Sequence, residues 1–495
     1  MRVIVIGGGA AGLAVALALS REGCEVEVLE GDATPLPASP MQAFERWDRR
    51  GAPQVWHSHA FLARLRNLLL ARLPDFHAAL LEHGAYEVRF GSDLPPTLRD
   101  FRPEPGDEEL VLLACRRITF EWVARRLVES ARHVRWHSGA RVEGLVGELD
   151  AATGLPRVVG VRVRGDGGAW ESRADLVVDA SGRRSKLPRW LAGIGAAPVE
   201  EESEDCGIFY CSRFHRLRPG GHPPSSATLV GADLGYMKYA IFPGDSGIFS
   251  VTLAASPEDE PLRAILRPRA FDAAARALPA LRAWLDPARS EPVSPVRGMR
   301  NLRNRRARFV RGGEPVALGV HAVGDAAIHT NPLYGRGCTL AFVHAYALLD
   351  ALRAHPADPV ARARAFHEAT ERELGPWYTA AREQDREARR VAAAQRAGEE
   401  PDAPVSSDPG ARIDPRAFMR SVIREGLLPA LRTDAAVLRA FVRSFNLLSA
   451  PDALVADPAV FGRILATWRT RETLPPAELQ GPARQEMVEL LARVA

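Results

Sequence analysis

The sequence predicts an α/β fold, α+β overall, in which a nucleotide-binding domain carries an inserted antiparallel β-sheet and a C-terminal helical cap. Three observations lead to this prediction. A strand–helix–strand pattern with a glycine-rich turn fills residues 1–30, strand-like segments separated by Gly/Pro turns recur over 207–253, and helical patterns dominate beyond 363. The chain of 495 residues is long enough for about two to four domains and a large ligand cavity.

The composition excludes several classes of protein. A hydrophobic fraction of 46% and a charged fraction of 25% exclude gross disorder, and a net charge of +4 gives no nucleic-acid-binding footprint. Five cysteines without Cys-x-x-Cys spacing predict neither a disulfide framework nor a zinc site. Residues 3–19 are uncharged, but their glycines argue against a secretory leader, and no other stretch approaches a membrane span. We therefore expect a cytoplasmic protein that binds neither nucleic acid nor a structural metal.

Residues 1–30 carry a complete dinucleotide-binding pattern. A buried strand over 2–7, a helix over 13–21 and a second strand over 25–30 define a Rossmann-type unit. The turn over 7–12 fits G-x-G-x-x-G, whose glycines permit a tight turn, a close pyrophosphate and close helix packing. Glu30 stands where an acidic residue accepts hydrogen bonds from ribose hydroxyls. The candidate cofactor-binding residues of this unit are Gly7, Gly9, Ala10, Ala11, Gly12 and Glu30.

The glycine-rich turn could serve either FAD or NAD, and a segment far along the chain distinguishes between these two dinucleotides. Gly324-Asp325 is followed by Asn-Pro-Leu-Tyr-Gly-Arg-Gly-Cys over 331–338 and by an apolar helix over about 339–352. These residues resemble the flavoprotein monooxygenases of the p-hydroxybenzoate hydroxylase type and their relatives, the geranylgeranyl reductases and flavin-dependent halogenases. The resemblance implies FAD, with Asp325 on a ribityl hydroxyl and Pro332 beside the isoalloxazine ring. Gly335, Gly337 and the helix start at Cys338 would then offer N–H groups to the N1/O2 edge of the flavin.

Two further segments carry the same resemblance. A strand is predicted to lead into Asp179-Ala-Ser181-Gly182, a variant of the hydroxylases' Asp-Gly motif in which Ser181 replaces an aspartate. That motif helps to bind FAD and reduced nicotinamide in the hydroxylases, so the variant leaves open whether NAD(P)H reacts directly or through a flavin reductase. Arg117, in Arg-Ile-Thr-Phe-Glu, is similar to a cofactor-proximal arginine of the reductase branch, with a solvated surface role as the alternative. By the same analogy, Val142 would contact the adenine through its backbone.

The middle of the chain predicts the substrate side of the site. Strand-like segments over 207–216, 236–242 and 247–253 suggest an antiparallel sheet that covers the flavin. Its aromatic residues either line an apolar substrate pocket or form ordinary sheet core, and the candidates are Tyr210, Tyr236 and Tyr239.

A polar loop over 45–60 follows the ribose-binding carboxylate. The hydroxylases place a mobile, arginine-bearing loop here, so Arg49 or Arg50 is a candidate pyrophosphate contact. His57 and His59 are the candidate catalytic residues, because an imidazole near neutral pKa can move a proton at the substrate. The alternative is that both histidines only hydrogen-bond within the loop.

These patterns define four predicted parts of the chain. Residues 1–190 form the first part of the FAD-binding domain, with an excursion to the substrate domain near 85–115. Residues 191–300 form the substrate-domain sheet, and 301–370 return to the FAD-binding domain. Residues 371–495 form the helical region, with a break at Gly375-Pro376 and a polar linker near 397–414. Its later helices are predicted over 415–426, 428–448, 458–470 and 482–494.

The sequence therefore predicts an FAD-dependent oxidoreductase. The first hypothesis is a monooxygenase that uses O₂, through a flavin C4a-hydroperoxide, to hydroxylate or epoxidise an apolar aromatic or polyene molecule of secondary metabolism. The second is a carbon–carbon double-bond reductase or dehydrogenase of the geranylgeranyl reductase type. A halogenase is disfavoured, because that family's early active-site lysine and Trp-x-Trp-x-Ile-Pro stretch are missing. The non-enzymatic alternative is a flavoprotein without turnover.

Overall fold

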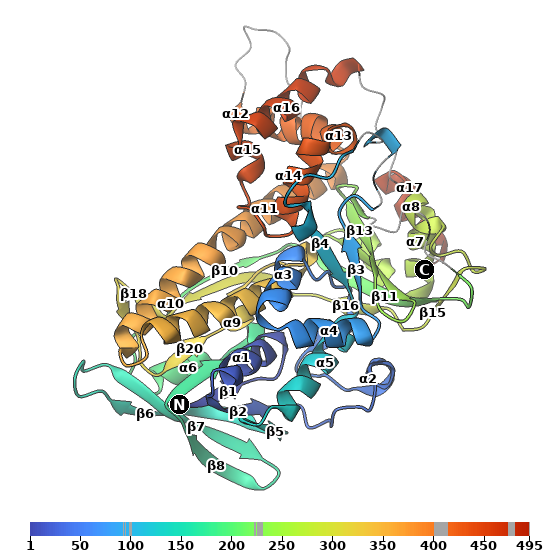
Figure 1. Cartoon of the computed structure of the whole chain (residues 1–495). Helices are drawn as coiled ribbons and strands as arrows, with labels where there is room; N and C mark the ends of the chain where they lie inside the picture. Colours follow the sequence, from blue (N-terminus) through green and yellow to red (C-terminus); the bar gives the residue numbers. More distant parts are fainter. Residues whose placement is uncertain are drawn as a thin grey trace.

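A five-stranded parallel sheet lies at the centre of the molecule. The computed structural model describes residues 1–92, 94, 96–98, 101–221, 224, 231–399, 414–473 and 481–494. The strand order is β20 (Val320–Ala322), β9 (Leu176–Asp179), β1 (Arg2–Ile6), β2 (Glu25–Glu30) and β5 (Val134–Ser138) (Figure 1). All four pairings are parallel, so the carboxyl ends of the five strands share one edge. Segments that are distant in the sequence meet at this edge.

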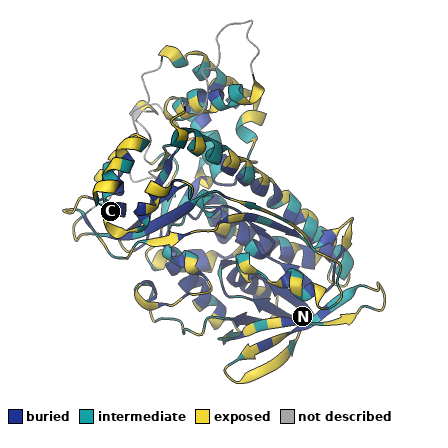
Figure 2. Ribbon diagram, turned by 180° about the vertical axis from the view of Figure 1, so that it is seen from behind, coloured by how far each residue is buried: buried dark blue, intermediate teal, exposed yellow. Residues whose placement is uncertain are grey.

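The two faces of this sheet are covered by different elements. Val3 and Val5 of β1 face the helices α1 (Ala10–Arg21), α5 (Arg117–Ser130) and α9 (Gly337–Ala354). Ile4 and Ile6 face the other side, against an antiparallel sheet of β6 (Arg141–Leu149), β7 (Pro156–Gly165) and β8 (Gly168–Arg173). Burial on both faces explains the continuous apolar run of β1. The predicted α/β fold with a Rossmann-type unit is confirmed, and Figure 2 shows its buried centre and the exposed β8 hairpin.

A six-stranded antiparallel sheet forms the second body of the fold. Its path runs through β12 (Gly231–Asp233), β13 (Met237–Pro243), β14 (Ile248–Ala255), β11 (Phe209–Leu217) and β15 (Ser290–Pro292), and β16 (Arg297–Met299) also pairs with β11. Alternate side chains of these strands point to opposite sides. One side packs against α7 (Pro268–Ala277) and α17 (Arg484–Val494), and the other faces the parallel sheet's carboxyl edge.

Smaller elements join these two bodies. β3 (Tyr86–Arg89) and β4 (Val111–Ala114) form a hairpin within the predicted excursion near 85–115. β10 (Glu200–Asp205), β17 (Arg303–Arg308) and β21 (Ile328–His329) form a three-stranded sheet. The remaining elements are α2 (Pro40–Arg46), α3 (Ala63–Arg72), α4 (Pro74–Glu82), α6 (Leu187–Ala192), α8 (Pro279–Arg282), β18 (Val310–Arg311) and β19 (Glu314–Pro315).

The C-terminal helices divide into two groups. α10 (Pro359–Glu373) and α11 (Gly375–Ala397) are separate helices that meet at the predicted Gly-Pro break. α12 (Pro415–Ser421), α13 (Leu428–Thr433), α14 (Ala435–Phe445), α15 (Ala453–Ala456) and α16 (Pro458–Arg469) form a small helical group (Figure 1). The single helix predicted over 428–448 is wrong, because Asp434 caps a new helix with its side chain. α17 packs on the antiparallel sheet instead of this group. Most of the predicted linker near 397–414 lies outside the described residues.

A buried ion pair fixes the antiparallel sheet to the start of α5. Asp245, in the turn between β13 and β14, accepts hydrogen bonds from the backbone N–H (2.8 Å) and Nε (3.1 Å) of Arg116. It also accepts one from Oγ1 of Thr119 at 2.9 Å. Both charged side chains are at most 1% exposed. Burial alone would raise the pKa of Asp245, but the Arg116 guanidinium holds that pKa below its ordinary value, so the carboxylate remains charged.

We therefore predict that Asp245→Ala lowers the free energy of unfolding by about 3–5 kcal/mol, because Arg116 is left as a buried charge without its partner. The control is Asp75→Ala, which removes a solvent-exposed ion pair with Arg21 and should cause a much smaller loss. Urea denaturation of the two variants measures the difference. Equal losses would contradict the role assigned to the buried pair.

Candidate functional site

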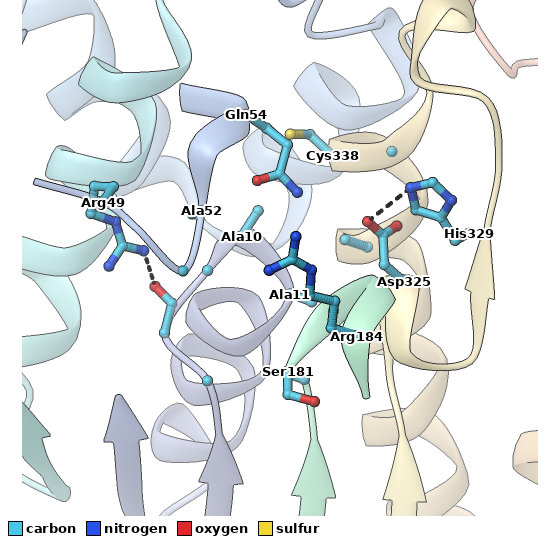
Figure 3. A pocket seen from close by; sticks show the side chains of 18 of the residues that line it. Ala10, Ala11, Arg49, Ala52, Gln54, Ser181, Arg184, Asp325, His329 and Cys338 are labelled. Carbon is cyan, nitrogen blue, oxygen red and sulfur yellow. Dashed lines mark hydrogen bonds and ion pairs between the residues drawn. The ribbon is translucent and has the colours of Figure 1, made fainter. Parts of the chain in front are cut away.

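A large cavity opens at the carboxyl edge of the parallel sheet. Its volume is about 400 Å³, and the turns after β1, β2 and β9, the start of α9 and one side of the antiparallel sheet form its walls. Figure 3 shows side chains from these separate segments around the same space. The predicted site residues that line it are Gly7, Gly9, Ala10, Ala11, Glu30, His59, Arg117, Val142, Tyr210, Asp325, Pro332, Gly335, Gly337 and Cys338. Gly12, His57, Tyr236 and Tyr239 do not line it.

The glycines of the first turn serve two physical purposes. Gly7 has φ of +97°, and a Cβ there would lie 2.8 Å from the Ala180 carbonyl oxygen. A Cβ on Gly12 would lie 1.9 Å from the Gly7 carbonyl oxygen, so this glycine permits close packing of α1. A Cβ on Gly9 would meet nothing within 4 Å, so the space beside this residue is open. α1 begins here without a side-chain cap, which leaves its first N–H groups available to an anion.

Glu30 lies at the cavity wall beside this turn. Its carboxylate accepts hydrogen bonds from the backbone N–H groups of Gly8 and Asp32, each at 2.8 Å. Arg49 is buried and donates to the Gly8 carbonyl at 2.9 Å and to Glu121 at 3.1 Å. Glu121 also accepts from Arg117 at 2.8 Å, so one buried carboxylate positions two guanidinium groups in the wall. Arg50, the other loop candidate, is exposed and pairs with Asp48, outside the cavity lining.

The turn after β9 forms the opposite wall. Asp179 accepts a hydrogen bond from the Ser181 N–H at 2.9 Å and one from the Ser185 hydroxyl at 2.5 Å, which fixes the turn. Ser181, Gly182, Arg184 and Lys186 line the cavity. Figure 3 shows the Arg184 side chain pointing into it.

The sequence predicted the turn after Asp179 but gave no reason to place Arg184 or Lys186 in the site. The rule that ligands bind beyond the carboxyl ends of parallel strands was the signal that would have selected them.

The far end of the cavity is built on α9. Asp325 lines the cavity directly after Gly324, whose N–H donates to Nδ1 of His344 at 3.1 Å. The His344 Nε2 bonds to Thr370 on α10 at 2.9 Å, so two helices hold the Gly-Asp turn. α9 begins at Gly337 without a side-chain cap, so its N–H groups also face the cavity. Burial raises the pKa of Cys338 to about 11, so this residue is a neutral thiol in the wall.

The two candidate histidines occupy different environments. His59 lines the cavity, and its Nε2 accepts a hydrogen bond from Arg117 at 2.9 Å while its Nδ1 donates to the His57 carbonyl at 3.0 Å. Burial and the nearby Arg117 charge hold the pKa of His59 well below its ordinary value. Because both ring nitrogens are engaged and the ring is neutral, this geometry does not favour a proton-transfer role for His59. His57 lies behind the cavity wall, where its ring and that of Tyr210 pack edge-to-face.

Strand alternation separates the three candidate tyrosines. Tyr210 and Phe242 lie on the side of the antiparallel sheet that faces the cavity. Tyr239 points to the other side, into the core with α7, and Tyr236 lies in the same core and donates to the Pro482 carbonyl at 2.6 Å. The core alternative therefore describes Tyr239, whereas Tyr236 belongs to this core and also lines a smaller cavity beside α11. Phe242 is a cavity residue that the sequence did not identify.

These residues fit FAD in an extended pose. Two uncapped helix N-termini, α1 and α9, lie in the walls of one cavity, with the Glu30 carboxylate at one end and Asp325 near the other. The open space at Gly9 suits a pyrophosphate, and the α9 terminus suits the anionic edge of a reduced flavin. Among the described residues, no group of three or more His, Cys, Asp or Glu side chains is arranged to hold a metal ion.

Comparison with solved structures shows which proteins share this fold. PqsL of Pseudomonas aeruginosa, a probable FAD-dependent monooxygenase, aligns with a TM-score of 0.56 at 17% identity, over 80% of this chain and 96% of that structure. The myxobacterial FAD-dependent halogenase CndH aligns with a TM-score of 0.58 at 18% identity, over 100% and 96%. The anhydrotetracycline hydroxylase OxyS of Streptomyces rimosus gives 0.54 at 19%, over 91% and 77%. The chain therefore shares the fold of these FAD-dependent enzymes.

Sequence relatives show the family to which the chain belongs. Protein Rv3254 of Mycobacterium tuberculosis is 31% identical over 384 residues, which cover 71% of this chain and 73% of that protein. The chain therefore belongs to the family of Rv3254. Digeranylgeranylglycerophospholipid reductase 1 of Methanopyrus kandleri is 29% identical over 206 residues, which cover 41% of this chain and 44% of the reductase. Residues 5–39 match the NAD(P)-binding Rossmann-like domain model.

The different surroundings of Gly9 and Gly12 give a direct test of the site. Gly9→Val should fill the open space with a side chain and abolish FAD binding, while the melting temperature of the apoprotein stays unchanged. Gly12→Val should fail to fold, because its side chain would overlap the Gly7 carbonyl. FAD titration and thermal unfolding measure the two effects. Tight FAD binding by Gly9→Val would contradict the proposed pyrophosphate position.

Proposed function

We propose that this protein is an FAD-dependent monooxygenase that transfers one oxygen atom from O₂ to an apolar aromatic or polyene small molecule. The observation that carries the proposal is the continuity of the cavity from Glu30 to the start of α9, where the antiparallel sheet closes it with Tyr210 and Phe242. An extended dinucleotide would therefore have its reactive end between α9 and this sheet. The fold shared with the hydroxylases supports the same reading.

The residues of the cavity would hold FAD by complementary chemistry. The N–H groups at the start of α1 would bind the pyrophosphate, Glu30 the ribose and Asp325 the ribityl hydroxyls. The start of α9 would stabilise negative charge at the N1/O2 edge. When bound, FAD supplies the chemistry that side chains lack, which is acceptance of two electrons and reaction with O₂. The protein's own share is positioning, exclusion of water and control of protons.

Exclusion of water is favoured by the composition of the reactive end. Tyr210 and Cys338 are buried residues of its wall, and Phe242, Leu333 and Pro332 add apolar surface. A dry environment favours oxygen transfer to a substrate over loss of reduced oxygen as peroxide. The polar groups of the lining include the hydroxyls of Ser58 and Thr252, together with Arg117 and Asp325.

A second cavity supports a ring-bearing substrate. It has a volume of about 130 Å³, lies between the antiparallel sheet and α11, and shares Leu333 with the large cavity. That volume is close to the roughly 150 Å³ of an apolar protein cavity that holds benzene. Ala254, Met237 and Ala392 contribute apolar lining, whereas Lys238, Arg389 and Asp385 contribute charged groups.

The polar end of this second cavity is a buried carboxylate network. Asp385 accepts hydrogen bonds from Tyr334 (2.7 Å), Asn331 (2.7 Å) and Asn304 (2.6 Å). We propose that this cavity admits one ring of the substrate beside Leu333, with the Tyr334 hydroxyl available as a hydrogen-bond partner.

The electron donor in this proposal is NAD(P)H, used directly or through a flavin reductase, in the cytoplasm. In the described residues no helix has the length and apolarity needed to cross a membrane.

One alternative reaction has support from specific observations. Similarity to the digeranylgeranylglycerophospholipid reductases and the position of Arg117 in the cavity wall favour reduction of a carbon–carbon double bond. The two reactions differ in their need for O₂. Reduction of the substrate proceeds anaerobically, whereas oxygen transfer does not.

The proposed function is tested by reconstituting the protein with FAD and reducing it anaerobically with NADH or NADPH, with and without a flavin reductase. O₂ is then admitted in the presence of phenolic and polyene compounds. We expect substrate-dependent electron consumption and incorporation of labelled oxygen into the product. Product formation under anaerobic conditions would favour the reductase, and tight FAD binding without any turnover would contradict both reactions.

The second cavity is tested by filling it. Ala392→Phe should place a ring in this cavity and raise KM for ring-bearing substrates by at least tenfold (about 1.4 kcal/mol), without changing FAD affinity. Ala393→Phe is the matched control, because Ala393 is the adjacent residue of α11 and is exposed. Unchanged kinetics in Ala392→Phe would remove this cavity from the account of substrate binding.

A further inference from the structure

A chain of hydrogen bonds connects the buried His57 with the cavity. Nδ1 of His57 lies 3.2 Å from Oγ of Ser212 on β11, and that oxygen lies 2.7 Å from Oγ1 of Thr252 on β14. Thr252 donates in turn to Oγ of Ser58 at 2.7 Å. Ser58 and Thr252 line the cavity, whereas Ser212 and His57 are 1% and 4% exposed. Three separate segments of the chain therefore supply one continuous path.

The hydrogen bonds of this path point in one direction. Because Thr252 gives its only proton to Ser58, it must accept from Ser212. Ser212 then has no proton left for His57, so Nδ1 of His57 must be the donor. Each hydrogen bond of the path is thus donated in the direction of the cavity. The Ser58 hydroxyl can then donate its proton to a group inside the cavity. This order describes a path prepared to deliver a proton.

The proposed reactions require such a delivery. Oxygen transfer converts substrate, O₂, NAD(P)H and one proton into hydroxylated substrate, water and NAD(P)⁺. In hydroxylation the O–O bond and a carbon–hydrogen bond break, and a carbon–oxygen bond forms. The hydrogen leaves the carbon as a proton, and the second oxygen atom leaves as water after taking up protons. Reduction of a carbon–carbon double bond by NAD(P)H also consumes one proton. In either case a water-poor cavity must receive one proton from solvent in each turnover.

We propose that Ser212, Thr252 and Ser58 form a proton relay from His57 into the reaction cavity. This inference rests on the proposed function, but it holds for both of the reactions considered there. His57 donates its Nδ1 proton as its Nε2 accepts one from a solvent molecule, so the ring exchanges tautomers and never needs to carry a charge. Each hydroxyl passes one proton on and receives one, and rotation of the hydroxyls resets the path.

The surroundings of His57 suit this neutral exchange. Burial, together with the charges of Arg297 and Arg183, lowers the pKa of His57 to about 3, so the imidazolium form is not populated at neutral pH. The Tyr210 ring packs edge-to-face against the imidazole, with ring centroids 4.9 Å apart. His59, although it lines the cavity, has both ring nitrogens engaged. The relay therefore assigns His57 a positioning and proton-passing role and leaves His59 as part of the wall.

The relay is tested with dithionite-reduced holoenzyme mixed with O₂, so that no substrate needs to be known. Reduction of O₂ to H₂O₂ takes two electrons and two protons, and an anionic reduced flavin carries only one of these protons. Thr252→Val keeps the size of the side chain but breaks the path, so flavin reoxidation should slow by roughly a hundredfold. Ser212→Ala should have a similar effect. Added acetic acid should partly restore the rate, because it replaces the missing proton donor.

Two controls separate the relay from a structural effect. Thr252→Ser keeps a hydroxyl at the same position and should reoxidise at nearly the wild-type rate. Ser250→Ala removes a buried hydroxyl from the same strand and the same side of the sheet, outside the path, and should change nothing. The FAD dissociation constant should be the same in all variants. Wild-type kinetics in Thr252→Val, or equal slowing in Thr252→Ser, would overturn the relay while FAD binding and the proposed function stand. A wild-type protein that binds no FAD would overturn both.

Discussion

The parallel pairing of β20, β9, β1 and β2 is the constraint on which the site depends. It places the turn after Ile6, the turn after Asp179 and the turn after Ala322 at one edge of one sheet, although these residues are far apart in the chain. Close packing of α1 requires that no Cβ separates Gly12 from the Gly7 carbonyl. Once these contacts form, two helix N-termini face the same cavity without any further adjustment.

The buried charged side chains of the cavity wall form a network in which each contacts a side chain of opposite charge. Glu121, from α5, accepts hydrogen bonds from Arg49 and Arg117, and Arg49 also lies 3.5 Å from Glu30. Charges this deeply buried are costly unless each has a partner, so the network both lowers that cost and holds two guanidinium groups beside the cavity. Burial, together with the charge of Arg117 that donates to its ring, lowers the pKa of His59 and keeps it neutral. The candidate site therefore combines a buried charge network with apolar side chains from the antiparallel sheet.

Much of the fold and of the cofactor end of the site is readable from sequence, because local rules decide it. The glycine turn, the Glu30 position, the 324–338 segment and the break at Gly375-Pro376 each depend on short-range backbone chemistry. The placement of side chains from the antiparallel sheet depends instead on register. Tyr239 and Phe242 belong to the same strand, and only their pairing with β14 decides that Phe242 faces the cavity while Tyr239 faces the core. No local pattern distinguishes these two aromatic residues.

Long-range contacts account for the other differences. The path from His57 to Ser58 requires hydroxyls from two strands that meet only in the folded sheet, so the sequence offers the histidine without its connection. α17 has the amphipathic pattern of the helices before it, yet it packs on the antiparallel sheet. Asp434 is a recognisable helix cap inside a continuous helical pattern, and its side chain begins a new helix there.

The most direct test of the central claim is a crystal structure of the protein purified with its natural cofactor, with the released cofactor identified by mass spectrometry. The account predicts FAD in an extended pose, with its adenosine ribose at Glu30, its pyrophosphate at the start of α1 and its isoalloxazine ring beside Pro332 and the start of α9. A nicotinamide dinucleotide in this cavity, or FAD bound at another place, would contradict the account.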